Sequence, residues 1–202
     1  IDRMGFEGRS KAAPTPESVA QRIEAMAYTL HQSAVTWPQM VKERYTDRRP
    51  PNVVSPLMDT FKFGGARGRW MASGHFQLQP EQALVIKSWP VGAPYQGIQL
   101  TDLWFASLEY ANRVTSLTRQ QSVLAPDGAI YFVITSEETG YPNWLDTMGL
   151  EQGAFIMRYD GVGGAIEPSR WPSAQLVDLR DLPEIIPGFE GARITADDRD
   201  QQ

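Results

Sequence analysis

The sequence predicts a mainly β protein, a jelly-roll-like β-sandwich that carries an N-terminal helical arm. Residues 15–46 hold an apolar stripe at helical spacing, whereas the chain from residue 50 onward alternates short apolar segments with Gly, Pro, Asn and Asp. With 202 residues, 42% of them hydrophobic, the chain can bury a core as one domain plus an arm without disulfides. These observations divide it into a flexible N-terminus (1–14), a helical arm (15–49), a β-sandwich (50–190) and a C-terminal tail (191–202).

The helical arm begins at an N-terminal signal. Thr15 can cap the helix, Pro16 suits its first turn, and Glu17 complements the helix dipole there. An apolar stripe follows at spacings of four, three and four residues: Val19, Ile23, Met26 and Leu30. This pattern predicts a helix of about four turns.

A second helix is expected to start near Thr36 and to end before the Pro-rich breaker cluster at 48–52. Its predicted inward side chains are Trp37, Met40, Val41 and Tyr45. Near the other end of the chain, residues 195–198 have the Thr-x-x-acid form of a helix start. Only four residues follow them, so we expect either a short stub or a truncated helix there.

Beyond the breaker cluster, strands are predicted from apolar runs bounded by turn residues. They are expected near 69–78, 83–89, 97–110, 129–136, 153–159 and 174–180. Strands in such close succession, without helical patterns between them, favour a sandwich or barrel over parallel βαβ units.

Composition excludes several classes of function. The 19 Lys and Arg residues against 24 Asp and Glu residues give a net charge of −5, so we expect no nucleic-acid partner. The chain has no cysteine and only two histidines, so we expect no metal site and no cofactor. No apolar stretch is long enough to span a membrane. The lack of cysteine favours the cytoplasm, although a removed leader remains open.

Strand parity singles out Asp102 as the candidate catalytic residue. The other even-numbered positions of the predicted strand are apolar or aromatic: Ile98, Leu100, Trp104, Ala106, Leu108 and Tyr110. A carboxyl group on such a face must be hydrogen-bonded, paired with a cation or raised in pKa, and a raised pKa suits a general acid or base. The alternative is a structural carboxylate bonded to backbone amides or to an arginine.

Six tryptophans make an aromatic-lined ligand pocket at one end of the sandwich a reasonable expectation. Trp70, Trp104 and Trp144 are expected to form its walls. Asn143 and Arg158 are the expected polar ligand-binding residues. The alternative for Trp144 is a plug that closes the end of the sandwich.

Several of these segments together resemble a bacterial family catalogued as domain of unknown function 1214. The resemblance lies in the run Tyr95–Trp104, the Asp127-Gly128 turn, the block Gly140-Tyr141-Pro142-Asn143-Trp144-Leu145-Asp146-Thr147, and Arg158. It covers roughly residues 50–200. The resemblance implies a jelly-roll-type β-sandwich that often occurs beside a second such domain, and it implies no established reaction.

Two hypotheses for function follow. The first is a protein that binds a small, largely apolar molecule such as a lipid, steroid, terpenoid or aromatic compound, with cofactor-free hydrolase, lyase or isomerase chemistry at Asp102. The second is a non-catalytic oligomerisation or interaction module, in which residues 15–46 contact a second copy or a partner chain.

Overall fold

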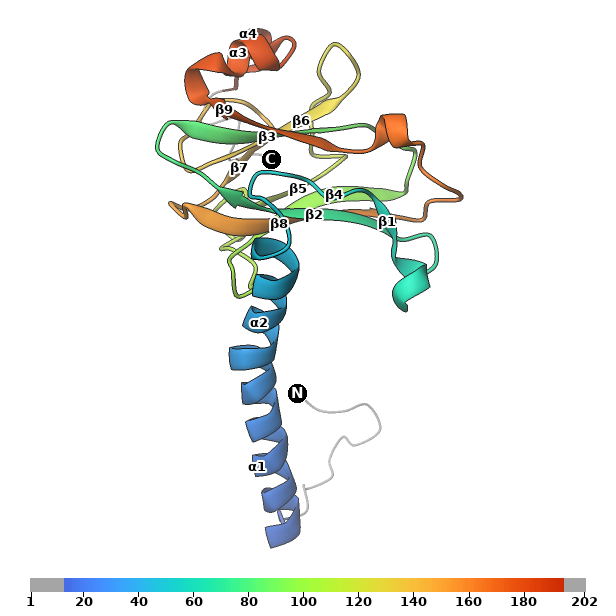
Figure 1. Ribbon diagram of the computed structural model, residues 1–202, viewed down its shortest axis with the longest axis vertical. Helices are drawn as coiled ribbons and strands as arrows, with labels where there is room; N and C mark the ends of the chain where they lie inside the picture. The colour runs from blue at the N-terminus through green and yellow to red at the C-terminus, as the bar shows by residue number, and fades with distance from the viewer. Residues whose placement is uncertain (1–12, 195–202) are drawn as a thin grey trace. The chain divides into compact units, whose positions relative to one another are not determined.

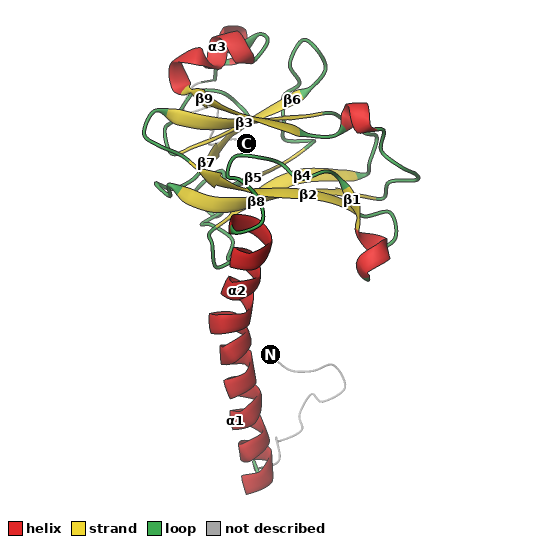
Figure 2. Ribbon diagram, viewed as in Figure 1, coloured by secondary structure: helices red, strands yellow, loops and turns green. Residues whose placement is uncertain are grey.

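The computed structural model describes residues 13–194 and shows a mainly β protein with two sheets and a helical N-terminal arm (Figures 1 and 2). The chain divides into two compact units, the first ending at Gln39 and the second beginning at Met40. We call residues 40–194 the β unit. The helices and strands, in chain order, are α1 (Pro16–His31), α2 (Trp37–Val41), β1 (Met58–Asp59), β2 (Trp70–Gln77), β3 (Gln82–Ser88), β4 (Tyr95–Thr101), β5 (Ser116–Thr118), β6 (Ile130–Thr135), β7 (Trp144–Asp146), β8 (Gln152–Asp160), β9 (Ser173–Asp178), α3 (Leu182–Ile185) and α4 (Phe189–Ala192).

The β unit contains a five-stranded sheet in the order β1-β2-β8-β4-β5 and a four-stranded sheet in the order β7-β6-β3-β9. Neighbouring strands are antiparallel except β6 and β7, which are parallel. In the five-stranded sheet β8 is central, and its register places Gly153 opposite Phe76 of β2 and Arg158 opposite Met71.

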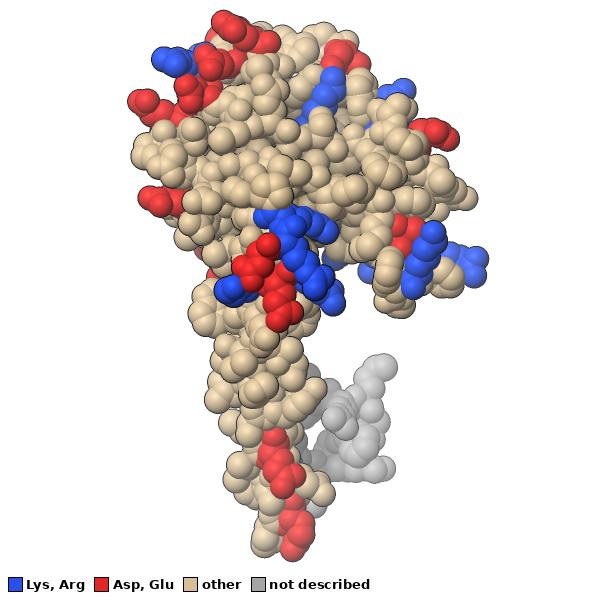
Figure 3. Space-filling model, in the orientation of Figure 1, with Lys and Arg blue, Asp and Glu red and all other residues tan. Residues whose placement is uncertain are grey.

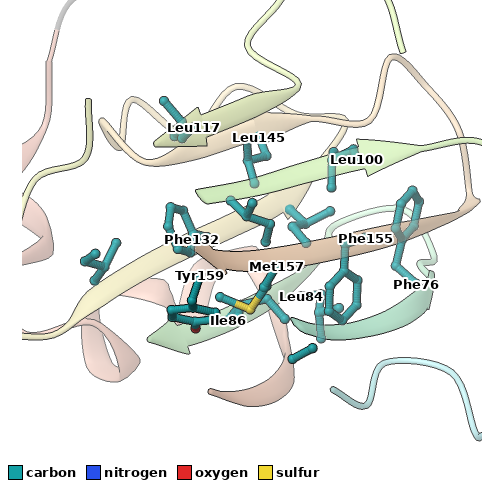
Figure 4. Packing of buried hydrophobic residues seen from close by; sticks show 14 of the residues in the cluster. Phe76, Leu84, Ile86, Leu100, Leu117, Phe132, Leu145, Phe155, Met157 and Tyr159 are labelled. Carbon is teal, nitrogen blue, oxygen red and sulfur yellow. The ribbon is translucent and has the colours of Figure 1, made fainter. Parts of the chain in front are cut away.

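The main core lies between the two sheets, where apolar side chains from both meet (Figure 4). Period-two alternation supplies them: Phe155, Met157 and Tyr159 point inward from β8, and the intervening residues point away. The Tyr159 hydroxyl lies 3.0 Å from the Ser88 hydroxyl of β3, so a buried polar contact also joins the sheets. Burial raises the pKa of Tyr159 to about 12.

A second apolar cluster covers the other face of the four-stranded sheet. It joins Val85 of β3 and Val133 of β6 to Leu182 of α3 and Phe189 of α4. Because apolar residues cover both faces of this sheet, every residue of β6 is buried.

Helix α1 begins as the sequence predicts. Thr15 is its N-cap, the Thr15 hydroxyl accepts a hydrogen bond from the Ser18 backbone amide at 3.2 Å, and Pro16 occupies the first turn. No residue of α1 is buried.

The predicted break between two helices does not occur, because the backbone stays helical from Pro16 to Thr46 through π-helical turns at Gln32–Thr36 and Lys42–Thr46. The first π turn directly precedes Pro38, which has no amide hydrogen and whose ring crowds the preceding turn of a regular helix, so a wider turn accommodates it. Of the predicted inward side chains, Val41 is buried, Met40 and Tyr45 are half-buried, and Trp37 is exposed.

Within the described residues no helix is both long enough and apolar enough to cross a bilayer. The predicted helix start at 195–198 and most of the predicted flexible N-terminus lie outside the described residues.

Candidate functional site

The predicted position of Asp102 on an inward strand face is wrong. Strand β4 ends at Thr101, and the predicted strand 97–110 continues as turns and loop. The Asp102 carboxylate accepts hydrogen bonds from the backbone amides of Trp104 and Ala106 at 2.8 and 2.9 Å. An aspartate that bonds the amide two residues ahead closes a tight turn, so the alternative of a structural carboxylate describes its contacts, and the apolar setting argued for acid–base chemistry is missing.

The tryptophans predicted as pocket walls lie in three different settings. Trp104 follows Asp102 in this loop and is 61% exposed. Trp70 is half-buried at the start of β2 and packs against the main core. Trp144 is buried at the start of β7, where its indole Nε1 donates a hydrogen bond to the Thr135 backbone oxygen at 2.9 Å.

Asn143 and Arg158 also have distinct surroundings. The fully buried Asn143 donates to the Val123 backbone oxygen and accepts from the Val123 amide, both at 2.8 Å, so its amide group is used to fix a loop. Arg158 is exposed on the outward face of β8, between Met71 of β2 and Gly97 of β4. The predicted site residues therefore do not converge on one pocket.

A polar hollow of about 400 Å³ lies beside Trp144. Asp146, two residues along β7 and only 3% exposed, accepts hydrogen bonds from the Arg113 guanidinium at 3.2 Å and from the Met148 amide at 2.7 Å. Sequence reasoning missed Arg113 and Asp146 as part of this site. The signal for Asp146 is its parity with Trp144, since residues two apart in a strand share a face, but the sequence predicts no strand over 144–146.

The apolar stripe of α1 departs from ordinary burial. Val19, Ile23, Met26 and Leu30 are 41–71% exposed. The polar residues Glu17, Glu24 and His31 recur at intervals of seven and lie outside the stripe. A row of exposed apolar side chains is a feature common among protein interaction surfaces.

The described residues contain no group of three or more His, Asp or Glu side chains placed to hold a metal ion. For recognition, the α1 stripe thus offers apolar contact, and the hollow beside Trp144 offers the buried Asp146 carboxylate paired with the exposed Arg113 guanidinium.

Comparisons with known proteins inform the fold alone. No family model and no curated protein matches the chain. The structure is similar to that of an uncharacterised protein from Burkholderia cenocepacia, with a TM-score of 0.73 and 21% identity, over 86% of this chain and 48% of that chain. The VPA0106 protein of Vibrio parahaemolyticus gives a TM-score of 0.41 and 16% identity, over 83% and 47% of the two chains. This chain spans about half the length of each.

Proposed function

We propose that this chain is a non-catalytic interaction module that self-associates through α1, and that its β unit is a jelly-roll-like sandwich. The observation that carries the proposal is the exposed apolar stripe of α1, in which no residue is buried. Helices in folded proteins gain most of their stability from packing of an apolar face, so the exposed stripe of α1 favours a packing partner.

The spacing of the stripe fits a helical pair. Val19, Ile23, Met26 and Leu30 alternate at four and three residues, which is the d-a-d-a pattern of a coiled-coil seam. The flanking positions Ala20 and Ala27 are small, so a second helix can approach closely.

Charge supports a second copy of this chain as the partner. In a parallel, in-register pair Arg22 lies beside Ala27 of the second copy, so no like charges meet across the seam. Glu17 and Glu24 lie on the face away from the seam. Helices that bind anionic membrane surfaces are rich in Lys and Arg, whereas α1 has one arginine, Arg22, against Glu17 and Glu24.

The test is the mass of the full chain in solution, measured by sedimentation across a range of concentrations. We expect a concentration-dependent dimer for the wild type, and a monomer for Ile23→Glu because a charge in the seam would be buried without a partner. The matched control Gln21→Glu adds the same charge away from the seam and should leave the dimer intact. A wild-type monomer at all concentrations, or an undiminished dimer of Ile23→Glu, contradicts the proposal.

Orientation is testable because the chain has no cysteine. A Val19→Cys variant should form a symmetric disulfide under mild oxidation in a parallel pair, because the same position meets itself across the seam. An antiparallel pair places Val19 near the far end of the other helix and should give no such disulfide.

Small-molecule binding stays as a second candidate, and the hollow beside Trp144 supports it. The buried Asp146 carboxylate and the exposed Arg113 that pairs with it favour a small polar ligand more than the wholly apolar one expected from the sequence. A thermal-shift screen of the wild type against Arg113→Gln tests it, since a ligand of this hollow should stabilise the wild type only. The resemblance to domain of unknown function 1214 and the cytoplasmic location are likewise proposals that rest on the sequence.

A further inference from the structure

We propose that the β unit binds a phosphate monoester bearing an apolar group, in a hollow lined by Arg44, Arg48, Arg49, Met58 and Phe63. This inference is independent of association through α1. The hollow has a volume of about 620 Å³, and all five lining residues belong to the β unit.

The cationic wall comes from the end of the helical segment. Arg44 lies in the π turn Lys42–Thr46, where the helical segment ends, and Arg48 and Arg49 lie in the turn that follows, before Pro50-Pro51. The Arg49 guanidinium lies 3.4 Å from both the Ser73 backbone oxygen and the Ser73 hydroxyl, so β2 fixes one of the three cations over the outward face of the five-stranded sheet.

The positive charge of these three arginines is only partly offset by the acids near them in the chain. Of the two acids in this stretch, Asp47 is engaged by Lys42 at 2.6 Å, and Glu43 directly precedes Arg44 in the sequence. No ion pair joins Arg44, Arg48 or Arg49 to a described carboxylate. Lys and Arg side chains gather near the centre of the view in Figure 3, with acidic side chains beside them. Three guanidinium groups around one hollow repel one another, and a bound anion relieves that repulsion.

The opposite wall is apolar. Met58 of β1 and Phe63 of the 3₁₀ turn Thr60–Phe63 are both exposed in the chain as described. Their exposure leaves apolar surface next to the cations, which an alkyl or aryl group attached to the anion would cover. Arg67 lies over the nearby Phe61 ring at 4.9 Å and adds another positive charge to this turn.

The combination favours phosphate over other anions. A phosphate monoester carries close to two negative charges at neutral pH and three acceptor oxygens, which match several guanidinium groups. A carboxylate has one charge and satisfies a single guanidinium fork. The adjoining Met58 and Phe63 favour a substituted phosphate over the inorganic ion.

Calorimetric titration of the full chain with phenyl phosphate tests the site. We expect measurable binding, weaker binding of inorganic phosphate, and affinity that falls as salt rises because the groups are near the surface. Arg48→Gln should weaken phenyl phosphate binding about tenfold, the effect of losing one charge-assisted contact. Phe63→Ala should reduce the preference for phenyl phosphate over inorganic phosphate.

Arg180→Gln is the matched control, because it makes the same change in net charge at an exposed arginine elsewhere on the β unit. It should bind phenyl phosphate as the wild type does. Equal loss in both variants would indicate a net-charge effect and overturn the proposal.

The monoester can be soluble or part of a lipid, and a second arm separates these sources. Vesicles of phosphatidylcholine with and without phosphatidic acid are floated with the wild type and with Arg48→Gln. Arginine-dependent flotation only with phosphatidic acid assigns the site to a lipid headgroup, and phenyl phosphate binding without flotation assigns it to a soluble monoester. Binding in neither arm overturns the proposal.

Discussion

Asp102 shows how a single side chain can end a strand. Its carboxylate takes the amides of Trp104 and Ala106, and its own amide donates to the Ala106 backbone oxygen at 3.0 Å. The parity argument failed because alternation of apolar residues continued in the sequence after the backbone had left the sheet. The better predictor of the strand end is the tendency of an aspartate side chain to accept a hydrogen bond from the backbone amide two residues later, which favours a turn.

Replacing Asp102 with alanine should lower the free energy of unfolding by about 1 kcal/mol, since two backbone amides lose a common acceptor that water partly replaces. Asp102→Asn keeps an acceptor oxygen and should cost less. Urea denaturation of both variants measures this, and a larger loss in the asparagine variant than in the alanine variant would show that the negative charge matters more than the hydrogen bonds.

His75 makes stability depend on pH. It is 6% exposed on β2, and its Nδ1 has no hydrogen-bond partner among the described residues. Burial is the largest cause that lowers the pKa of His75 below its usual value of 6.5. The positive charge of Arg49 lowers this pKa further, and a hydrogen bond with the Tyr45 backbone opposes the change. The folded state thus favours the neutral ring, and the unfolded state binds the proton more readily.

The free energy of unfolding should therefore decrease as pH falls below about 6.5, and it should be fully retained above that value. His75→Gln should flatten this dependence between roughly pH 5 and 7, even where it lowers stability overall. His31→Gln changes an exposed histidine of α1 and serves as the control. Equal slopes in the wild type and His75→Gln would remove His75 as the source.

At the scale of elements, long strands could be predicted and short ones could not. Strands β2, β3, β6, β8 and β9 lie within about two residues of their predicted limits, because apolar runs and turn residues bound them. Strands β1, β5 and β7 have two or three residues each and depend on a neighbouring strand for their conformation. No local pattern encodes that dependence.

Close packing between elements makes Gly153 of β8 sensitive to substitution. A Cβ atom there would clash with the Phe76 ring of β2 and would lie 2.6 Å from the Thr101 backbone oxygen of β4. Both strands are hydrogen-bonded to β8, so neither can move away easily. Gly153→Ala should destabilise the protein by about 1–3 kcal/mol.

The control is Gly163→Ala, since no heavy atom lies within 4 Å of a Cβ at that position. Thermal denaturation of the two variants makes the comparison. An unchanged midpoint for Gly153→Ala would mean that β2 and β4 move apart more readily than their packing indicates.

For the whole molecule, the β unit carries its own core and should fold without the first 39 residues. We expect residues 40–202 to retain the β-rich circular dichroism spectrum and the unfolding midpoint of the monomeric Ile23→Glu chain. Loss of cooperative unfolding in this fragment would show that residues before Met40 contribute to the core.

Which residues come together at a site is harder to predict from the sequence than the strands are. Periodicity indicates which face of a strand a residue occupies, but not which strands become neighbours, so Trp144 and Arg158 were grouped although they belong to different sheets. The α1 stripe was predictable because its spacing is local. The arginine hollow was not, because it joins the end of the helical segment to β1 and the turn after it.

The π turn at Gln32–Thr36 limits the length of the helix–helix contact in the proposed dimer. Each residue in a π turn advances less than the usual 100° around the axis, so side chains beyond it rotate out of line with those before it. Helix α1, which precedes this turn, has 16 residues and is therefore about 24 Å long. A helix–helix contact of that length gives a weak dimer, so we expect the proposed dimer to dissociate on dilution and its subunits to exchange rapidly.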